Sequence, residues 1–266
     1  IPPTEKVPTK NDYVDASRFP YDARKALGAA IDEAETVESG GKLVLNIWRG
    51  GKTMPVELTL PVMGSYSRTT PFKCEKTNTL VTKTADRILE RGLHEGGIQS
   101  SLDALGLLAT GEEKYINYLR KWVRQVEKFD PDNKEIWRKG CAWTVGYELI
   151  FLAEYYMATK DEYIKPTVDR YAEIIIMGQS FPGTWSHGMA TPALNYGRDH
   201  GMTAAYGSMN SVTASCAIAL VLARKAGAAH PQLDKAIHKS SNFLAYFAER
   251  GTIPYGDHSP RMKSND

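Results

Sequence analysis

Apolar residues recur at helical spacing through most of the chain from residue 77 onward. This spacing is typical of amphipathic helices, and glycine or proline separates the periodic segments. The segment 141–159 is apolar nearly all round, which indicates a helix enclosed by other helices. The pattern predicts about seven helices and no strands in this part, at residues 77–92, 98–111, 112–129, 141–159, 161–178, 211–227 and 231–251.

A different pattern precedes this helical body. Residues 1–20 are rich in Pro, Lys and Thr without periodicity and predict an extended lead-in. Residues 21–37 carry one apolar helical stripe, and residues 42–60 alternate apolar and polar side chains around Gly50 and Gly51, which predicts a two-stranded hairpin. The expected parts are therefore a lead-in at 1–20, a small α+β module at 21–64 and a helical domain at 65–266.

The helix followed by the hairpin "KLVLNIWRGGKTMPVELTLP" resembles the closing half of a PDZ domain, over residues 21–62. PDZ domains bind extended peptides by strand addition beside a glycine-rich loop, so the resemblance implies a protein partner. Residues 1–20 contain no such glycine-rich apolar stretch. Two expectations stay open: the sequence begins inside a longer protein, or a shortened module serves as a structural brace.

Three helix ends of the body resemble one another, namely "ERGLHEGG", "GQSFPGTWSHG" and "ERGTIPYGDH". In the middle one, Gln179, Gly183 and Trp185 resemble the QxxxGxW pattern of terpenoid-cyclase-like α/α toroids, where the glutamine caps helix ends and the tryptophan packs over them. The resemblance implies an α/α toroid, or an open arc of helical hairpins if the ring is incomplete. The layout as a whole resembles uncharacterised bacterial proteins with a PDZ-plus-toroid order, which implies a periplasmic or secreted location.

The composition and the motifs of the sequence limit the classes of partner and cofactor that we expect. The chain is 42% hydrophobic and 24% charged with a net charge of +2, so no electrostatic footprint favours nucleic acid. No apolar run is long enough for a membrane span. Cys74, Cys141 and Cys216 lack metal-binding or redox spacing and are expected to be structural thiols. No metal and no cofactor are predicted, because HExxH, P-loop, GxSxG and dinucleotide fingerprints are absent from the sequence.

Candidate chemistry concentrates in the segment 178–210, between two predicted helices. Its His, Asn, Tyr and Arg residues are the types that helical-toroid polysaccharide lyases use for β-elimination. One group neutralises the uronate carboxylate, and a Tyr or His takes the C5 proton. We therefore predict catalytic roles for His187, Arg198, His200 and Tyr206. Substrate-binding roles are predicted for Trp185, Tyr196, Asn210, Tyr255, Asp257 and His258.

Each candidate also has a structural alternative. Trp185 could be a packing plug at a helix end, and Asn210 could cap the following helix. Glu148 and Glu154 fall in the most apolar helix, where a buried acid must be hydrogen-bonded or shift its pKa. A glycoside hydrolase would need two such acids close together.

The leading expectation is binding or cleavage of a carbohydrate polymer, by a polysaccharide lyase or a glycoside hydrolase. The alternative is a non-catalytic scaffold or protein-binding module. A terpene-cyclase-like enzyme, which needs an apolar pocket and an acid, is the third.

Overall fold

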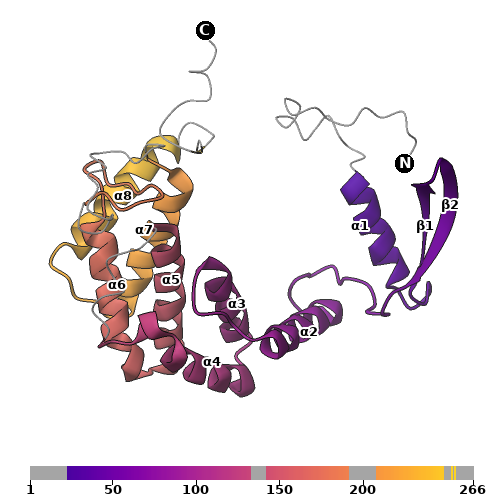
Figure 1. Cartoon of the computed structure of the whole chain (residues 1–266), viewed down its shortest axis with the longest axis horizontal. Coiled ribbons are helices and arrows are strands. Elements are labelled where there is room, and N and C mark those ends of the chain that lie inside the picture. Colours follow the sequence, from indigo (N-terminus) through magenta and orange to yellow (C-terminus); the bar gives the residue numbers. More distant parts are fainter. Residues whose placement is uncertain (1–22, 133–141, 192–207, 249–252, 254, 256–266) are drawn as a thin grey trace, which may run out of the picture. The chain divides into compact units, whose positions relative to one another are not determined.

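The computed structural model describes residues 23–132, 142–191, 208–248, 253 and 255 of the 266. The chain divides into two compact units, residues 1–84 and 85–266. The described residues form eight α-helices and one antiparallel sheet of two strands (Figure 1). The expectation of a mainly helical protein with a small β-containing part is thereby confirmed.

The first unit contains the predicted helix and hairpin. The helix is α1 (Ala23–Ala34), and the strands are β1 (Lys42–Arg49) and β2 (Lys52–Thr59). Arg49 pairs with Lys52 across the turn at Gly50 and Gly51, whose φ angles of 58° and 79° suit glycine. Strand β1 packs against α1 and buries Leu43. The prediction of a two-stranded hairpin that turns at Gly50 and Gly51 is confirmed.

Helix α2 (Glu75–Arg91) belongs to both units. Lys76 lies in the part of α2 that belongs to the first unit and is only 1% exposed. Its Nζ lies 3.0 Å from the carboxylate of Asp32 on α1 and 2.8 Å from that of Glu35, just after α1. Farther along α2, Ala85 and Ile88 join the core of the second unit. The boundary between the units therefore falls inside α2, whereas the sequence pattern placed the start of the helical domain at residue 65.

The second unit contains all the remaining predicted helices. Short 3₁₀ turns at Glu127–Phe129 and Glu162–Ile164 flank α5 in the chain. The helices are α3 (Ile98–Ala109), α4 (Glu113–Gln125), α5 (Ala142–Thr159), α6 (Lys165–Met177), α7 (Asn210–Lys225) and α8 (Leu233–Ala248).

These helices alternate between two rows. Helix α5 packs against α3, α6 and α7, and α7 packs against α5, α6 and α8 (Figure 1). Helices α3, α5 and α7 thus form one row, while α4, α6 and α8 are their hairpin partners, with α6 also contacting α8. Leu149, Phe151 and Leu152 of α5 are fully buried, so the prediction of an enclosed helix is confirmed.

Helices α3, α5 and α7 run in the same direction. The backbone N–H of Gly97, just before α3, donates to Glu148 in the second turn of α5 at 2.7 Å. The thiol of Cys216, in the second turn of α7, donates to the carbonyl of Ala142, the first residue of α5, at 3.6 Å. The N-terminal ends of the row therefore meet at one end of the unit. We call this end the rim, made of residues 93–98, 142–148, 185–189 and 208–213.

Candidate functional site

His187 is held at the rim by two consecutive residues of α5. Its backbone carbonyl accepts from the N–H of Ala142 at 3.0 Å, and its ring Nδ1 accepts from the indole Nε1 of Trp143 at 3.1 Å. The side chain of His187 is exposed, although it follows the buried Trp185 by only two positions. The loop after α6 and the start of α5 thus present one polar side chain in a defined position.

Two aromatic rings lie beside this histidine. Trp143 and Tyr147 are four residues apart on α5, so they occupy the same helix face. Their rings are nearly parallel, with an interplanar angle of 6° and centroids 6.4 Å apart. Both side chains are half-buried. The rim therefore combines a partly exposed aromatic pair with an oriented imidazole.

The described residues on both sides of 192–207 are tied together at the rim. The carbonyl of Trp185 accepts from the N–H of Met209 at 3.0 Å, and the N–H of Trp185 donates to Thr213 Oγ1 at 3.2 Å. The hydroxyls of Thr184 and Ser208 lie 2.6 Å apart in a buried hydrogen bond. The described residues before 192 and after 207 therefore both lie at the rim.

Four of the predicted site residues are brought to this end. His187 is exposed, while Trp185 is 2% exposed and its Nε1 donates to the carbonyl of Ile175 at 2.9 Å, so the Trp185 ring is part of the core. The backbone N–H of Asn210 donates to the carbonyl of Tyr255 at 3.0 Å, and Tyr255 is 63% exposed. Asn210 is the first helical residue of α7 and Met209 occupies the N-cap position, so the alternative of an Asn210 cap is wrong.

The other predicted site residues lie outside the described residues, and their roles stay predictions. They are Tyr196, Arg198, His200, Tyr206, Asp257 and His258.

Glu148 is a buried carboxylate just behind the rim, 2% exposed. It forms an ion pair with Lys128 and accepts from the N–H of Gly97 through Oε1, and Oε2 accepts from the hydroxyl of Tyr171 at 3.0 Å. Burial, together with the negative charge of Glu148, raises the pKa of Tyr171 well above its ordinary value, so this phenol stays a donor. Both carboxylate oxygens are therefore engaged, and they tie α5 to α6, to the start of α3 and to the 3₁₀ turn after α4. Glu154 is half-exposed on another face of α5 and does not pair with Glu148.

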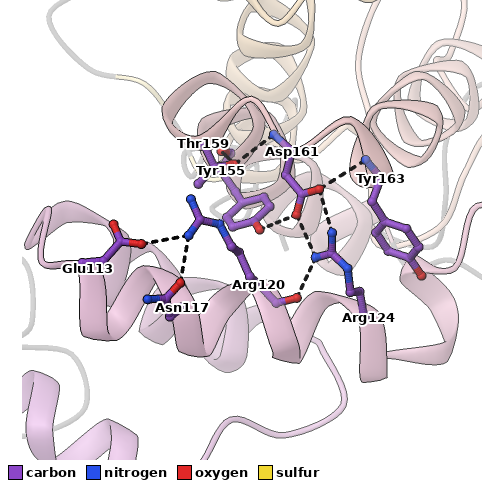
Figure 2. Close-up of polar contacts among 8 residues, drawn as sticks. All are labelled: Glu113, Asn117, Arg120, Arg124, Tyr155, Thr159, Asp161 and Tyr163. Carbon is purple, nitrogen blue, oxygen red and sulfur yellow. Dashed lines mark hydrogen bonds and ion pairs between the residues drawn. The ribbon is translucent and has the colours of Figure 1, made fainter.

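A second polar cluster lies at the opposite end of α5 (Figure 2). The two terminal nitrogens of Arg124 donate to the two carboxylate oxygens of Asp161 at 2.8 Å each, and the Tyr155 hydroxyl donates to Asp161 at 2.7 Å. Desolvation alone would raise the pKa of Asp161, but the hydrogen bonds from Arg124 and Tyr155 outweigh it and lower that pKa below its ordinary value. This cluster joins α4 to the turn between α5 and α6, which is a structural role.

The QxxxGxW residues link the loop after α6 to α8. The side-chain amide of Gln179 donates to the carbonyls of Ala236 at 2.9 Å and Gly183 at 3.2 Å. Gly183 has a φ of 96°, and a Cβ there would lie 2.7 Å from the backbone carbon of Lys239. Glycine is therefore required where the loop passes α8.

Trp143 and Tyr147 are the site residues that the sequence analysis missed. In a helix that is apolar nearly all round, an aromatic pair at spacing four is equally typical of a core. The polar atom on each ring is the sequence feature that could have pointed to them, but it does not separate an exposed pair from a core pair.

Comparison with known proteins places the chain in a family. No curated protein and no solved structure matches it. Within the described ranges, every helix is too short or too polar to cross a bilayer. A family model described as "Domain of unknown function (DUF6288)" matches residues 77–266, which include α3 to α8 and most of α2. Because this match covers well over half of the 266 residues, the chain belongs to the DUF6288 family.

Proposed function

We propose that the protein binds a carbohydrate polymer at the rim and cleaves it by β-elimination. The observation that carries this proposal is the parallel pair of Trp143 and Tyr147 beside the oriented, exposed His187. Aromatic rings with a polar atom pack against the apolar faces of sugars while remaining in contact with water. Ligand sites typically combine such rings with a few fixed polar groups.

In this proposal the two helix rows are part of an α/α toroid or open arc. The parallel direction of α3, α5 and α7, and the contact between α6 and α8, support this arrangement. The hydrogen bond from Gln179 to Ala236 of α8 supports the resemblance of the loop to the QxxxGxW pattern. The PDZ-like helix and hairpin are proposed to contact a protein partner, in a periplasmic or secreted setting.

The proposed reaction needs three functions at a uronate. One group neutralises the carboxylate, a base takes the C5 proton, and an acid protonates the oxygen that leaves C4, so that a C4–C5 double bond forms. We assign neutralisation to Arg198, and to Tyr206 both the removal of the C5 proton and its return to the oxygen that leaves C4. His200 is the alternative group for this proton transfer, and His187 is a hydrogen-bond donor. The chain between the two tied flanks of the rim carries the first three of these residues.

The first test is a binding and turnover screen of the full chain. Acidic and neutral polysaccharides are incubated with it and assayed for new reducing ends and for the absorbance of unsaturated uronates. Tyr206→Phe and His187→Ala are expected to abolish turnover while the far-UV circular dichroism spectrum stays unchanged. Trp143→Ala is expected to weaken binding about tenfold, the scale of an aromatic anchor.

Trp48→Ala is the matched control, because Trp48 is 75% exposed on β1 in the other unit. It should leave binding and turnover unchanged. If no polysaccharide binds and the rim variants behave like wild type, the carbohydrate proposal fails and a protein-binding scaffold replaces it. Binding without turnover would leave a carbohydrate-binding module and remove the lyase step.

A terpene-cyclase-like enzyme is the second candidate, favoured by a partly exposed stripe of α5. Ile150 and Glu154 are half-exposed there, so one acid stands in an apolar stripe. Neighbouring helices also expose apolar side chains, Leu102 on α3 at 46% and Ile218 on α7 at 53%. Glu154→Gln would abolish turnover of an isoprenoid substrate but leave carbohydrate binding intact, which separates the two candidates.

A further inference from the structure

We infer that His187 acts at the rim as a neutral hydrogen-bond donor through Nε2, and that Trp143 is the positioning residue that sets this role. The inference names a role within the proposed carbohydrate site, so its ligand rests on the proposed function. The protonation pattern of the ring does not rest on the proposed function, because it follows from contacts inside the protein.

The first step is the identity of the donor. The indole nitrogen of tryptophan can only donate a hydrogen bond. In the 3.1 Å contact between Trp143 Nε1 and His187 Nδ1, the histidine nitrogen must therefore accept, and an accepting ring nitrogen carries no proton. A neutral imidazole has one proton, which then sits on Nε2.

The second step is that this geometry is held from several sides. The backbone carbonyl of His187 accepts from Ala142, the residue next to Trp143, so backbone and ring are fixed by the same helical turn. The carbonyl of Ala142 in turn accepts from Cys216 of α7. Trp143 lies in a helix and faces Tyr147 in a nearly parallel stack. An imidazole supported in this way needs little reorganisation when a ligand binds.

The third step is the chemical consequence. A general base needs an unprotonated nitrogen that can reach the proton it removes. Nδ1 of His187 already accepts from Trp143, and Nε2 carries the proton, so this histidine donates rather than abstracts. In the proposed elimination His187 therefore donates to a ligand oxygen, a sugar hydroxyl or the oxygen that leaves, while the base is a different group.

The first experiment reads the ring directly and without ligand. Two-bond ¹H–¹⁵N correlation spectra of the ¹⁵N-labelled full chain distinguish the two neutral tautomers, and the His187 signals are identified by their loss in His187→Gln. Wild type should show the proton on Nε2, and Trp143→Phe, which keeps a ring but removes the donor, should shift His187 toward a mixture of tautomers. Tyr147→Phe is the control and should leave the pattern unchanged. A proton on Nδ1 in wild type, or no response to Trp143→Phe, overturns the inference.

The second experiment measures binding of the polysaccharide identified in the screen. His187→Gln places an amide N–H near the position of Nε2 and is expected to bind within about threefold of wild type, whereas His187→Ala loses about tenfold, or 1.4 kcal/mol. Equal losses in both variants overturn the donor role. If no polysaccharide binds wild type, the proposed function fails, and the spectra still decide the role of Trp143.

Discussion

Single side chains hold distant segments of the second unit together, and Glu148 shows how a buried charge does so. Replacing it by Gln removes the charge that pairs with Lys128, while the amide keeps a similar shape. Breaking a buried pair costs about 3–5 kcal/mol, and Lys128 is 20% exposed, so we expect Glu148→Gln to lower the free energy of unfolding by about 3 kcal/mol. Urea denaturation of the full chain measures this loss.

Glu113→Gln is the matched control for that change. Glu113 is 69% exposed and pairs with Arg120 at 2.9 Å on the surface of α4. Exposed pairs contribute about 0–1 kcal/mol, so the denaturation midpoint should barely move. Similar losses in the two variants would show that Glu148 does not depend on its buried partners.

The second prediction for a single residue concerns the reactivity of the Cys74 thiol. Hydrogen bonds from Thr70 and Thr77, and then from the backbone of Ser67, lower the pKa of its thiol to about 6. The thiolate is the reactive form, so the rate of alkylation of Cys74 by iodoacetamide should rise with a midpoint near pH 6. Because Cys74 is only 1% exposed, the rate is expected to be low at every pH.

Peptide mapping by mass spectrometry follows Cys74 separately from the other cysteines. Thr70→Val removes the largest contribution and should move the midpoint toward the ordinary thiol pKa of about 8.5. A wild-type midpoint already near that value would contradict the assigned hydrogen bonds.

The sequence could identify His187 as a candidate but not its partner. Residue type and a glycine-rich loop pointed to His187, whereas the indole that orients it lies 44 residues away in the chain. Periodicity describes which face of α5 is apolar, and Trp143 and Tyr147 fit a buried face as well as an exposed one. Only the packing of the loop against α5 decides between these assignments.

At the scale of helices and strands, the hydrophobic pattern was sufficient for position but not for packing. The hairpin turn at Gly50 and Gly51 and the enclosed helix α5 were predicted, because both depend on local spacing. The alternation of helices between two rows depends on contacts between segments far apart in the chain, such as α5 with α7. The attachment of the start of α2 to the first unit likewise involves the ion pairs of Lys76 with Asp32 and Glu35, which no periodicity encodes.

Gly146 lies where α5 packs against Ser215 and Cys216 of α7, and a substitution there tests the packing of these two helices. A Cβ there would lie 3.3 Å from Cys216 Sγ and 3.6 Å from the backbone nitrogen of Cys216. Gly146→Val adds two further carbon atoms at this contact. Since overpacking a core costs about 1–3 kcal/mol, we expect a loss near the upper end of this range in urea denaturation.

Gly106→Val on α3 is the matched change, because no atom lies within 4 Å of the Cβ position there. Valine has a better helix propensity than glycine by a few tenths of a kcal/mol, so this variant should be neutral or slightly more stable. If Gly146→Val were equally harmless, α5 and α7 would not approach each other as described.

At the scale of the whole molecule, two compact units imply that acid does not act on the chain uniformly. Among the described residues, polar contacts lower the pKa values of the carboxylates Asp86 and Asp161, which both lie in the second unit. For Asp86 the causes are hydrogen bonds from Lys114 at 2.9 Å and from the Tyr115 hydroxyl at 2.7 Å. The second unit therefore contains two groups through which low pH reduces stability.

The sign of this effect follows from proton binding. Both pKa values are lower in the folded protein than in the unfolded chain, so near pH 4 the unfolded state binds more protons. The stabilisation by Asp86 and Asp161 is complete above the unfolded pKa of about 4 and is lost as the pH falls through the folded values. Urea midpoints should be insensitive to these groups between pH 5 and 7 and should fall as the pH is lowered further.

Asp161→Asn tests that expectation, because the amide cannot carry the charge that both nitrogens of Arg124 contact. We expect a loss of about 2 kcal/mol at pH 7, the scale of hydrogen bonds to a charged group, and a flatter decline below pH 4 than in wild type. Asp234→Asn is the control, since Asp234 is 82% exposed and pairs with Arg224 at the surface; it should follow the wild-type curve. If the urea midpoint of Asp161→Asn falls below pH 4 as steeply as that of wild type, the cluster at the end of α5 does not govern the acid stability of the second unit.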